Sequence, residues 1–149
     1  MLNLNENELL GIIPTSLSTI SSLIDLAIST KNLIGNIPQE LGLLTSLQTL
    51  YLHHNELTGT IPSSLSNISS LIDLAISTSN LIGSIPQELG LLTSLQTLYL
   101  HQNELTGTIP PSLSNISPFT LLCISTNNFK HSERIGLPHQ SSKAFSLSD

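Results

Sequence analysis

Residues 47–71, LQTLYLHHNELTGTIPSSLSNISSL, decide the fold of this chain. Leu50 and Leu52 alternate with polar or amphipathic residues, as expected for a short strand with one buried side. Gly59 and Pro62 then bend the chain, and apolar residues at helix-like spacing follow before a leucine begins the next strand. A circuit that returns to its starting phase after 24 residues predicts one coil of a solenoid rather than a hairpin.

A single coil of this kind cannot fold alone. Burying an apolar side chain contributes about 1.5–3 kcal/mol, whereas ordering the backbone costs roughly 1–2 kcal/mol per residue. Over 24 residues the cost exceeds what the inward side chains supply, so neighbouring coils must add burial and the hydrogen bonds of parallel strands about 4.8 Å apart. The side chains expected to point inward in this coil are Leu47, Leu50, Leu52, Leu57, Ile61, Leu65 and Ile68.

The same phase recurs along most of the chain, at Leu23, Leu47, Leu71, Leu95 and Phe119. A 48-residue repeat overlies it, because residues 17–62 match residues 65–110 at 42 of 46 positions. The four differences are Thr19/Asn67, Lys31/Ser79, Asn36/Ser84 and His54/Gln102. We therefore predict a solenoid over residues 1–131, with about five coils after a partial first one, and a Ser-rich disordered tail over residues 132–149.

The pattern LxxLxxLxLxxNxLxGxIPxxLxxL, seen in LTSLQTLYLHHNELTGTIPSSLSNI, resembles the plant-specific class of leucine-rich repeats. Receptor-like kinases, receptor-like proteins and polygalacturonase-inhibiting proteins contain such repeats. The resemblance covers residues 2 to about 129. It implies an α/β solenoid, a right-handed coil with a concave parallel sheet and a convex side of 3₁₀ turns or short helices. It also implies binding of proteins, peptides or glycans without catalysis.

Charge and composition exclude several classes of function. Eight of the ten acidic residues lie before residue 130, against one base, Lys31. A nucleic-acid partner is not expected, because phosphate binding needs clustered Lys and Arg. No basic amino-terminal region or long apolar run predicts a signal peptide or a membrane span, so we expect no membrane insertion by this chain. The resemblance favours the cell surface, while the sequence itself leaves the compartment undetermined.

The open side of the strands carries the candidate ligand-binding residues. Large amphipathic residues alternate there with Ala and Ser, which predicts two Tyr-His ridges about 10 Å apart with grooves of small residues between them. Tyrosine suits contact surfaces because it offers area at low entropic cost. The alternative is that these are solvated strand residues copied by duplication. The candidates are Asp25, Tyr51, His53, His54, Asp73, Tyr99, His101 and Gln102.

Two further sets of asparagines stand out. Asn7, Asn55, Asn103 and Asn127 follow the strands, where an amide side chain can satisfy backbone groups of adjacent coils, so we predict a structural asparagine ladder. Asn67 and Asn115 each begin an Asn-Ile-Ser sequon and are predicted N-glycosylation sites if the chain is secreted.

Other chemistry is poorly supported. A zinc site at His53, His54 and His101 would need nitrogens within about 4 Å of one another, whereas ridges two strands apart lie about 10 Å apart. The chain has no nucleophile-elbow motif, so we expect no enzyme, metal or other cofactor. The one cysteine, Cys123, excludes an intrachain disulfide and occupies an open strand position, where a small structural residue is the simpler interpretation.

Three functional hypotheses follow from these observations. The first is a non-catalytic recognition module that binds a protein, peptide or glycan on its concave face. The second is part of the ectodomain of a receptor-like kinase or receptor-like protein in cell-surface signalling. The third is a structural role, in which uncapped ends self-associate so that solenoids stack end to end.

Overall fold

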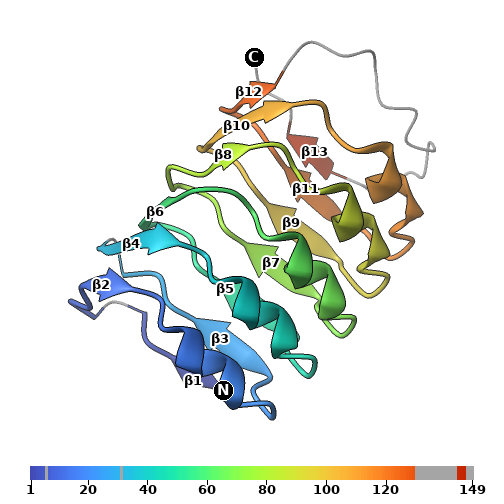
Figure 1. Cartoon of the computed structure of the whole chain (residues 1–149). Coiled ribbons are helices and arrows are strands. Elements are labelled where there is room, and N and C mark those ends of the chain that lie inside the picture. The colour runs from blue at the N-terminus through green and yellow to red at the C-terminus, as the bar shows by residue number, and fades with distance from the viewer. Residues whose placement is uncertain (6, 31, 130–143, 147–149) are drawn as a thin grey trace.

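A parallel sheet runs the length of the molecule in the computed structural model, which describes residues 1–5, 7–30, 32–129 and 144–146. Its strands lie in the order β1-β3-β5-β7-β9-β11-β13 (Figure 1). Neighbouring strands from β1 to β11 pair residues 24 apart, as in Leu26 with Leu50 and Leu50 with Leu74. The strands are β1 (Leu2–Asn3), β3 (Asp25–Ala27), β5 (Thr49–Tyr51), β7 (Asp73–Ala75), β9 (Thr97–Tyr99), β11 (Leu121–Cys123) and β13 (Ala144–Ser146).

Two smaller parallel sheets form after the chain leaves the main sheet, with their strands in the orders β2-β4-β6 and β12-β10-β8. Their strands pair residues 22 apart, as in Ile12 with Ile34, so this layer is offset from the main sheet by two residues per coil. Gly59 follows β6 at φ +74°, where a Cβ would lie 2.5 Å from the Asn36 side-chain oxygen. The strands are β2 (Gly11–Ile12), β4 (Leu33–Asn36), β6 (Glu56–Thr58), β8 (Ile82–Gly83), β10 (Glu104–Gly107) and β12 (Asn128–Phe129).

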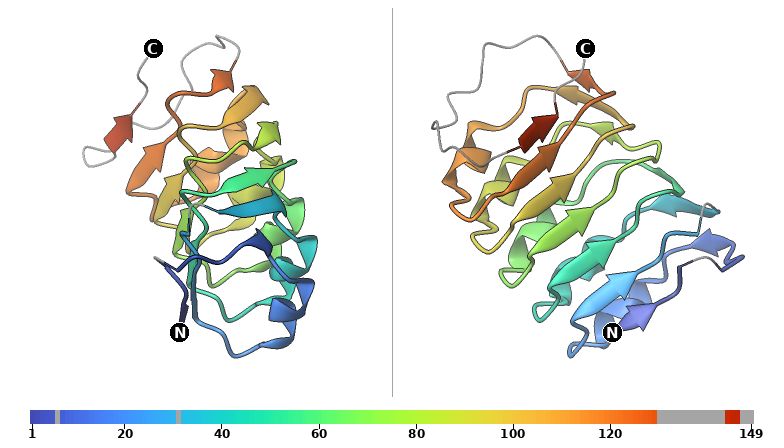
Figure 2. Two further views of the ribbon diagram at one scale, coloured as in Figure 1. Left: turned by 90° about the vertical axis from the view of Figure 1, so that its left-hand side faces the viewer. Right: turned by 180° about the vertical axis from the view of Figure 1, so that it is seen from behind.

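The side of each coil away from the main sheet consists of one 3₁₀ turn (Figure 2). Each turn follows a proline in extended conformation, because proline fixes φ at a value suited to starting a helical turn and needs no amide donor there. The turns are η1 (Thr15–Thr19), η2 (Gln39–Leu43), η3 (Ser63–Asn67), η4 (Gln87–Leu91) and η5 (Pro111–Asn115). The described residues thus form the coil with a parallel sheet and 3₁₀ turns that the resemblance implied.

The hydrophobic core fills the space between the main sheet and the 3₁₀ turns. All seven side chains expected to point inward in the coil that begins at Leu47 are buried, none more than 3% exposed. Phe119, at the leucine position of the last coil, is also buried at 4%. The leucine phase therefore identifies the core of each coil.

The predicted disordered tail falls partly within the described residues. Ala144–Ser146 form strand β13, which pairs in parallel with β11 through Leu122 and Phe145. Residues 132–143 and 147–149 lie outside the described residues, so the division into a solenoid and a tail stays a prediction.

Candidate ligand-binding face

The register of the main sheet arranges its exposed side chains in rows along the solenoid. One row contains Asp25, Thr49, Asp73 and Thr97. The next contains Ala27, Tyr51, Ala75, Tyr99 and Cys123. We call the side that carries these rows the concave face. Its strands are seen from the back in Figure 2.

Two aromatic ridges cross this face at alternate strands. Tyr51 and His53 meet edge to face with ring centroids 5.8 Å apart, and Tyr99 and His101 do so at 6.1 Å. His54 extends the first ridge, with its ring centroid 5.1 Å from that of His53. The structure therefore places the predicted aromatic candidates in two equivalent ridges, two strands apart.

The floor between the ridges is made of small side chains. Ala75 and Ser77, which lie between the two ridges, are only 5% and 4% exposed. Ala27 occupies the equivalent position before the first ridge and is 7% exposed. Small buried side chains therefore alternate with the tyrosines along this row, and Ala75 has a tyrosine on each side.

The two aspartates lie in the row beside the tyrosines. Asp73 accepts a 2.5 Å hydrogen bond from the hydroxyl of Thr97. Asp25 stands in register with Thr49 in the same way but makes no such bond in the described part of the chain. Burial, then the charge of Asp73, the neighbouring Tyr99 and the charge of Asp25 raise the pKa of Tyr51. The Tyr51 phenol thus lies in the field of both carboxylates.

The histidines occupy polar but partly buried positions. The Ser29 hydroxyl lies 3.3 Å from His53 Nδ1, whereas His101 Nδ1 is buried and without a partner among the described residues. Burial is the main cause that lowers the pKa of both His53 and His101, and the proximity of His54 lowers both further. Both imidazoles are therefore neutral at neutral pH.

His54 and Gln102 sit where the chain leaves the sheet, and both have left-handed backbone conformations, with φ of 55° and 56°. Gln102 accepts a hydrogen bond from the Thr78 hydroxyl at 2.9 Å. Periodicity alone did not identify these turns, because the left-handed residue is His, Gln or Thr rather than the Gly or Asn that normally signals one.

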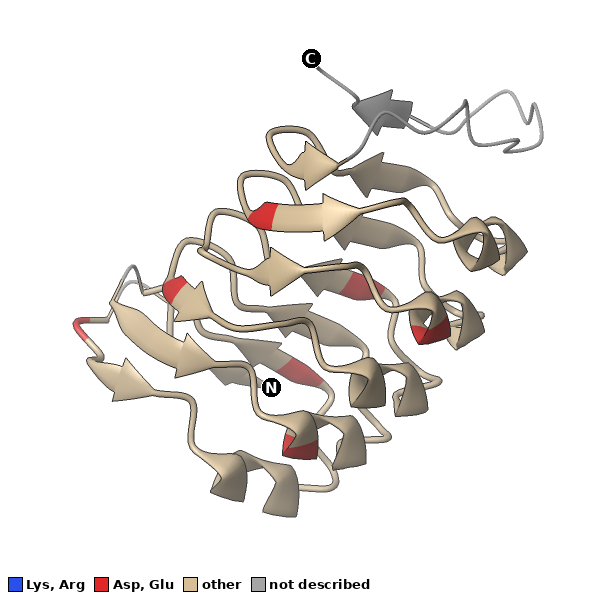
Figure 3. Ribbon diagram, turned by 45° about the horizontal axis from the view of Figure 1, so that its top comes forward, with Lys and Arg blue, Asp and Glu red and all other residues tan. Residues whose placement is uncertain are grey.

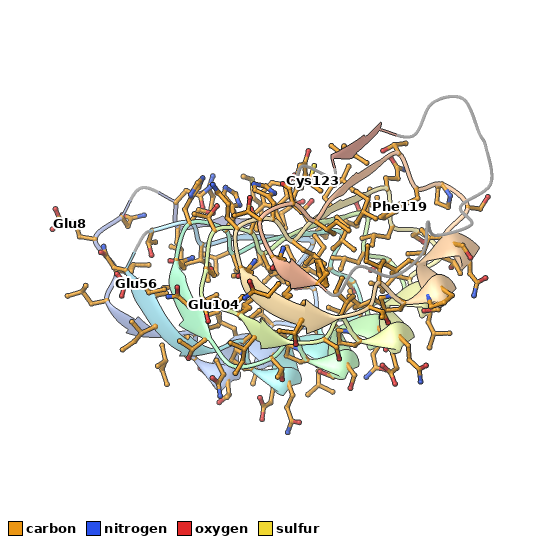
Figure 4. The ribbon with its side chains drawn as sticks, turned by 90° about the horizontal axis from the view of Figure 1, so that it is seen from above. Glu8, Glu56, Glu104, Phe119 and Cys123 are labelled. Atoms are coloured by element: carbon orange, nitrogen blue, oxygen red, sulfur yellow. The ribbon has the colours of Figure 1, made fainter. Side chains whose placement is uncertain are left out.

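The described residues carry acidic groups and no Lys or Arg (Figure 3). Seven carboxylates are present in this part of the chain, namely those of Glu8, Asp25, Glu40, Glu56, Asp73, Glu88 and Glu104. Glu8, Glu56 and Glu104 follow one another along the solenoid at alternate coils (Figure 4). Only Asp25 and Asp73 belong to the concave face, so its charge is concentrated in one row.

The asparagine side chains after the strands bind backbone groups of two coils. Asn55 donates to the carbonyls of Ile28 and Leu52 and accepts from the amide of Leu33 and the hydroxyl of Thr30. Asn103 and Asn127 repeat the backbone contacts in later coils. Asn7 is exposed and, among the described residues, donates only to Leu4 and Asn5 of its own coil, so these bonds hold one turn together rather than two coils.

The remaining candidates have plainer surroundings. Asn67 and Asn115 end η3 and η5 and are exposed, so the predicted glycosylation sites are accessible. Cys123 lies on β11 (Figure 4), and burial raises the pKa of its thiol, which favours the protonated form. No group of three or more potential metal-binding side chains occurs among the described residues.

The sequence did not predict a shallow groove on another side of the molecule. It has a volume of about 640 Å³ and lies where the strands of the smaller sheets run into the 3₁₀ turns. Its lining is uncharged, with amide and hydroxyl groups from Asn36, Thr60 and Ser84 and rings from Pro38, Pro62 and Pro86. Counting by 24 from any one of these residues would have shown the alignment.

Comparison with known proteins agrees with this geometry. The family description Leucine Rich Repeat matches residues 46–68 and 94–116, and no curated protein matches the chain. The plant peptide hormone receptor RGFR1, solved with RGF2, is 39% identical with a TM-score of 0.81 over 83% of this chain and 20% of that one. A plant ice-binding protein is 33% identical with a TM-score of 0.82 over 86% of this chain and 42% of that one.

A chain of the BIR3–SERK2 complex from Arabidopsis thaliana is 35% identical, with a TM-score of 0.74 over 91% of this chain and 72% of that one. The chain belongs to the leucine-rich-repeat family. Ectodomains of plant receptor kinases share this leucine-rich-repeat fold. HAESA was solved with a peptide hormone ligand, and the peptide hormone receptor RGFR1 was solved with RGF2.

The leucine-rich-repeat chain spans less than half the length of RGFR1 and of the ice-binding protein. The described residues include no helix with the length and apolar character needed to cross a membrane. The comparisons thus establish the family and the fold of plant receptor ectodomains.

Proposed function

We propose that this chain is a non-catalytic recognition module that binds a peptide or a peptide segment of a protein across its concave face. The observation that carries the proposal is the pair of Tyr-His ridges on either side of the small, buried side chains of Ala75 and Ser77. Aromatic side chains beside small residues offer contact area and depth together. RGFR1 and HAESA, whose fold the chain shares, were solved with peptide hormones.

A peptide is favoured over a glycan at this face. A peptide backbone presents side chains at regular intervals, and the concave rows also repeat at regular intervals along the sheet. A role as part of a cell-surface receptor is the natural setting for such a module, since receptor ectodomains are among the structures it resembles. Signalling itself would depend on parts other than this face.

Ice binding, the property for which one similar plant protein is named, has weaker support here. Ile34, Thr58, Ile82 and Thr106 are exposed on the smaller sheets, but the register of 22 residues per coil does not align them in one row. Instead, the exposed carboxylates of Glu56 and Glu104 pair in register with Ile34 and Ile82. A regular, uncharged array is therefore missing from these strands.

Self-association is the structural alternative to ligand binding. Leu10 and Ile12 are 80% and 66% exposed, and Ile12 lies on β2, a strand of the first smaller sheet. Exposed apolar side chains of this size mark contact surfaces. Light scattering over a hundredfold concentration range tests this role, because oligomers that disappear in Leu10→Lys/Ile12→Lys would support it and a persistent monomer would exclude it.

A displayed random-peptide library tests the proposed function. Peptides selected on the wild-type chain should bind Tyr51→Ala/Tyr99→Ala at least tenfold more weakly, because truncating aromatic anchors typically costs more than about 1 kcal/mol each. Thr58→Ala/Thr106→Ala, which changes exposed residues of the smaller sheets, is the matched control and should bind normally. Selected peptides that bind all three proteins equally would exclude the concave face as the site.

A further inference from the structure

We propose that the concave face is built for a cationic peptide in the polyproline II conformation, with a basic residue at every third position. The inference rests on the proposed function and adds the charge, conformation and period of the ligand. It follows from the spacing of the 48-residue repeat, the carboxylates of Asp25 and Asp73, and the alternation of tyrosine with alanine in the next row. The charge and the spacing of the side chains on this face both favour such a peptide.

The spacing of the two carboxylates on the concave face matches one turn of polyproline II. Asp25 and Asp73 lie in one row, two strands apart, through the register of Thr49 with each. Parallel strands are about 4.8 Å apart, so the two carboxylates recur at about 9.6 Å along the solenoid. Polyproline II has three residues per turn and rises about 3.1 Å per residue, so it presents one side at intervals of about 9.3 Å. An ordinary extended strand returns to the same side at about 6.8 Å, which does not match.

The charge of the concave face favours a cationic ligand. Asp25 and Asp73 are the carboxylates of the concave face, and the described residues supply no Lys or Arg to neutralise them. Asp25 forms no hydrogen bond with its register partner Thr49, in contrast to Asp73 with Thr97. A guanidinium group from the ligand would find acceptors in both carboxylates, with the Tyr51 ring nearby for cation–π contact.

Half-buried tyrosines alternate with buried alanines beside the two aspartates. The row next to the aspartates alternates Ala27, Tyr51, Ala75 and Tyr99, with both alanines buried. Grooves lined by aromatic rings accept proline-rich segments, since the polyproline II helix is already ordered and loses little entropy on binding. The residues between the basic positions of the ligand would therefore be prolines or similar residues that lie between the tyrosines.

Binding of synthetic peptides tests the period and the conformation together. The probe is (Arg-Pro-Pro)4, and its isomer Arg-Arg-Pro-Pro-Pro-Pro, given twice, keeps the composition but has no two arginines three positions apart. A third peptide, (Arg-Gly-Gly)4, keeps the spacing and loses the polyproline II bias. Calorimetry at low ionic strength should show the isomer and the glycine peptide binding at least tenfold more weakly than the probe.

The charge is tested on the protein. Asp25→Asn/Asp73→Asn should weaken binding of the probe at least tenfold. Glu40→Gln/Glu88→Gln removes the same charge from two residues also 48 apart, which lie in η2 and η4, and should leave binding unchanged. Equal losses in both variants would mean general attraction between opposite charges and would overturn the inference, as would equal binding of the isomer or no binding of the probe.

The outcome separates this inference from the function on which it rests. Library peptides that need Tyr51 and Tyr99 but lack basic residues at every third position would leave the concave face as a binding site and remove the cationic ligand. Library peptides that are indifferent to both tyrosines would remove the proposed function itself.

Discussion

Asn55 provides the sharpest test of how the coils are held together. Its side chain makes four hydrogen bonds at 2.7–3.2 Å, to the carbonyls of Ile28 and Leu52, the amide of Leu33 and the hydroxyl of Thr30. The residue is only 6% exposed, so water cannot replace these partners without opening the stack. Asn55→Ala would leave one amide and two carbonyls buried and unpaired.

The size of the effect follows from that count. A buried polar group left without a partner costs about 1–3 kcal/mol, and carbonyls lie toward the low end because they have a second lone pair. Three such groups give a loss of about 3–6 kcal/mol in the free energy of unfolding. Since small domains have about 5–15 kcal/mol in total, the variant should be close to unfolded at room temperature or clearly shifted to lower urea.

The assay is urea unfolding followed by far-ultraviolet circular dichroism, because the chain has no tryptophan. Asn7→Ala is the matched control, since Asn7 is exposed and its partners within the described part of the chain are two local carbonyls that water can satisfy. It should cost less than about 1 kcal/mol. Asn55→Asp separates the two halves of the amide, because it keeps the acceptor and loses the donor to Ile28 and Leu52. A loss in Asn55→Ala no greater than in Asn7→Ala would refute the role of the ladder in joining coils.

Three further outcomes follow from other parts of the structure. Because the pKa of His53 and His101 is lowered in the folded chain, the unfolded chain binds more protons, and the free energy of unfolding falls as the pH drops below about 6.5. His53→Gln/His101→Gln should therefore lose less of its urea midpoint between about pH 7.5 and pH 5 than the wild type, and an equal loss would contradict this. Gly90→Ala should lower the free energy of unfolding in urea by about 1–3 kcal/mol, because the new Cβ would lie 2.5 Å from the Ser112 carbonyl oxygen. Ser66→Ala, at the equivalent position one coil earlier, should be nearly neutral, and equal effects would exclude the close approach. Thr126→Asn should raise the free energy of unfolding by about 0.5–1 kcal/mol, since Thr126 has a φ of 55° that asparagine adopts more readily. Thr108→Asn, at an exposed position, should leave it unchanged, and thermal unfolding of both variants measures the difference.

Counting by 24 was enough to predict the main sheet. Because parallel strands in a solenoid stack without a register shift, the leucine phase gave the pairing of Leu50 with Leu74 and the row that joins Tyr51 to Tyr99. The ladder contacts of Asn55 and Asn103 follow from the same phase. The sequence alone does not name the ligand, because the packing of the fold does not determine what binds to its open face.

Other features escaped the periodicity for physical reasons. The smaller sheets pair residues 22 apart, so counting by 24 does not give their register. Thr30 and Thr78 are equivalent in sequence, yet Thr30 donates to Asn55 within the ladder while Thr78 has a φ of 55° and donates to Gln102. That difference depends on local backbone conformation, which a repeat pattern does not encode.

The contact between successive 3₁₀ turns recurs without change from one 48-residue block to the next. Ser64 donates to the Gln39 carbonyl at 2.7 Å, and Ser112 donates to the Gln87 carbonyl at the same distance. Each 48-residue block therefore packs against the next block through the same contacts that it makes with the block before it. Insertion of one more block by unequal recombination would lengthen the solenoid in frame, with no new interface to evolve. Each insertion would also add one more Tyr-His ridge, so the number of ligand contacts, and with it the avidity for a repetitive ligand, would grow in steps with gene length.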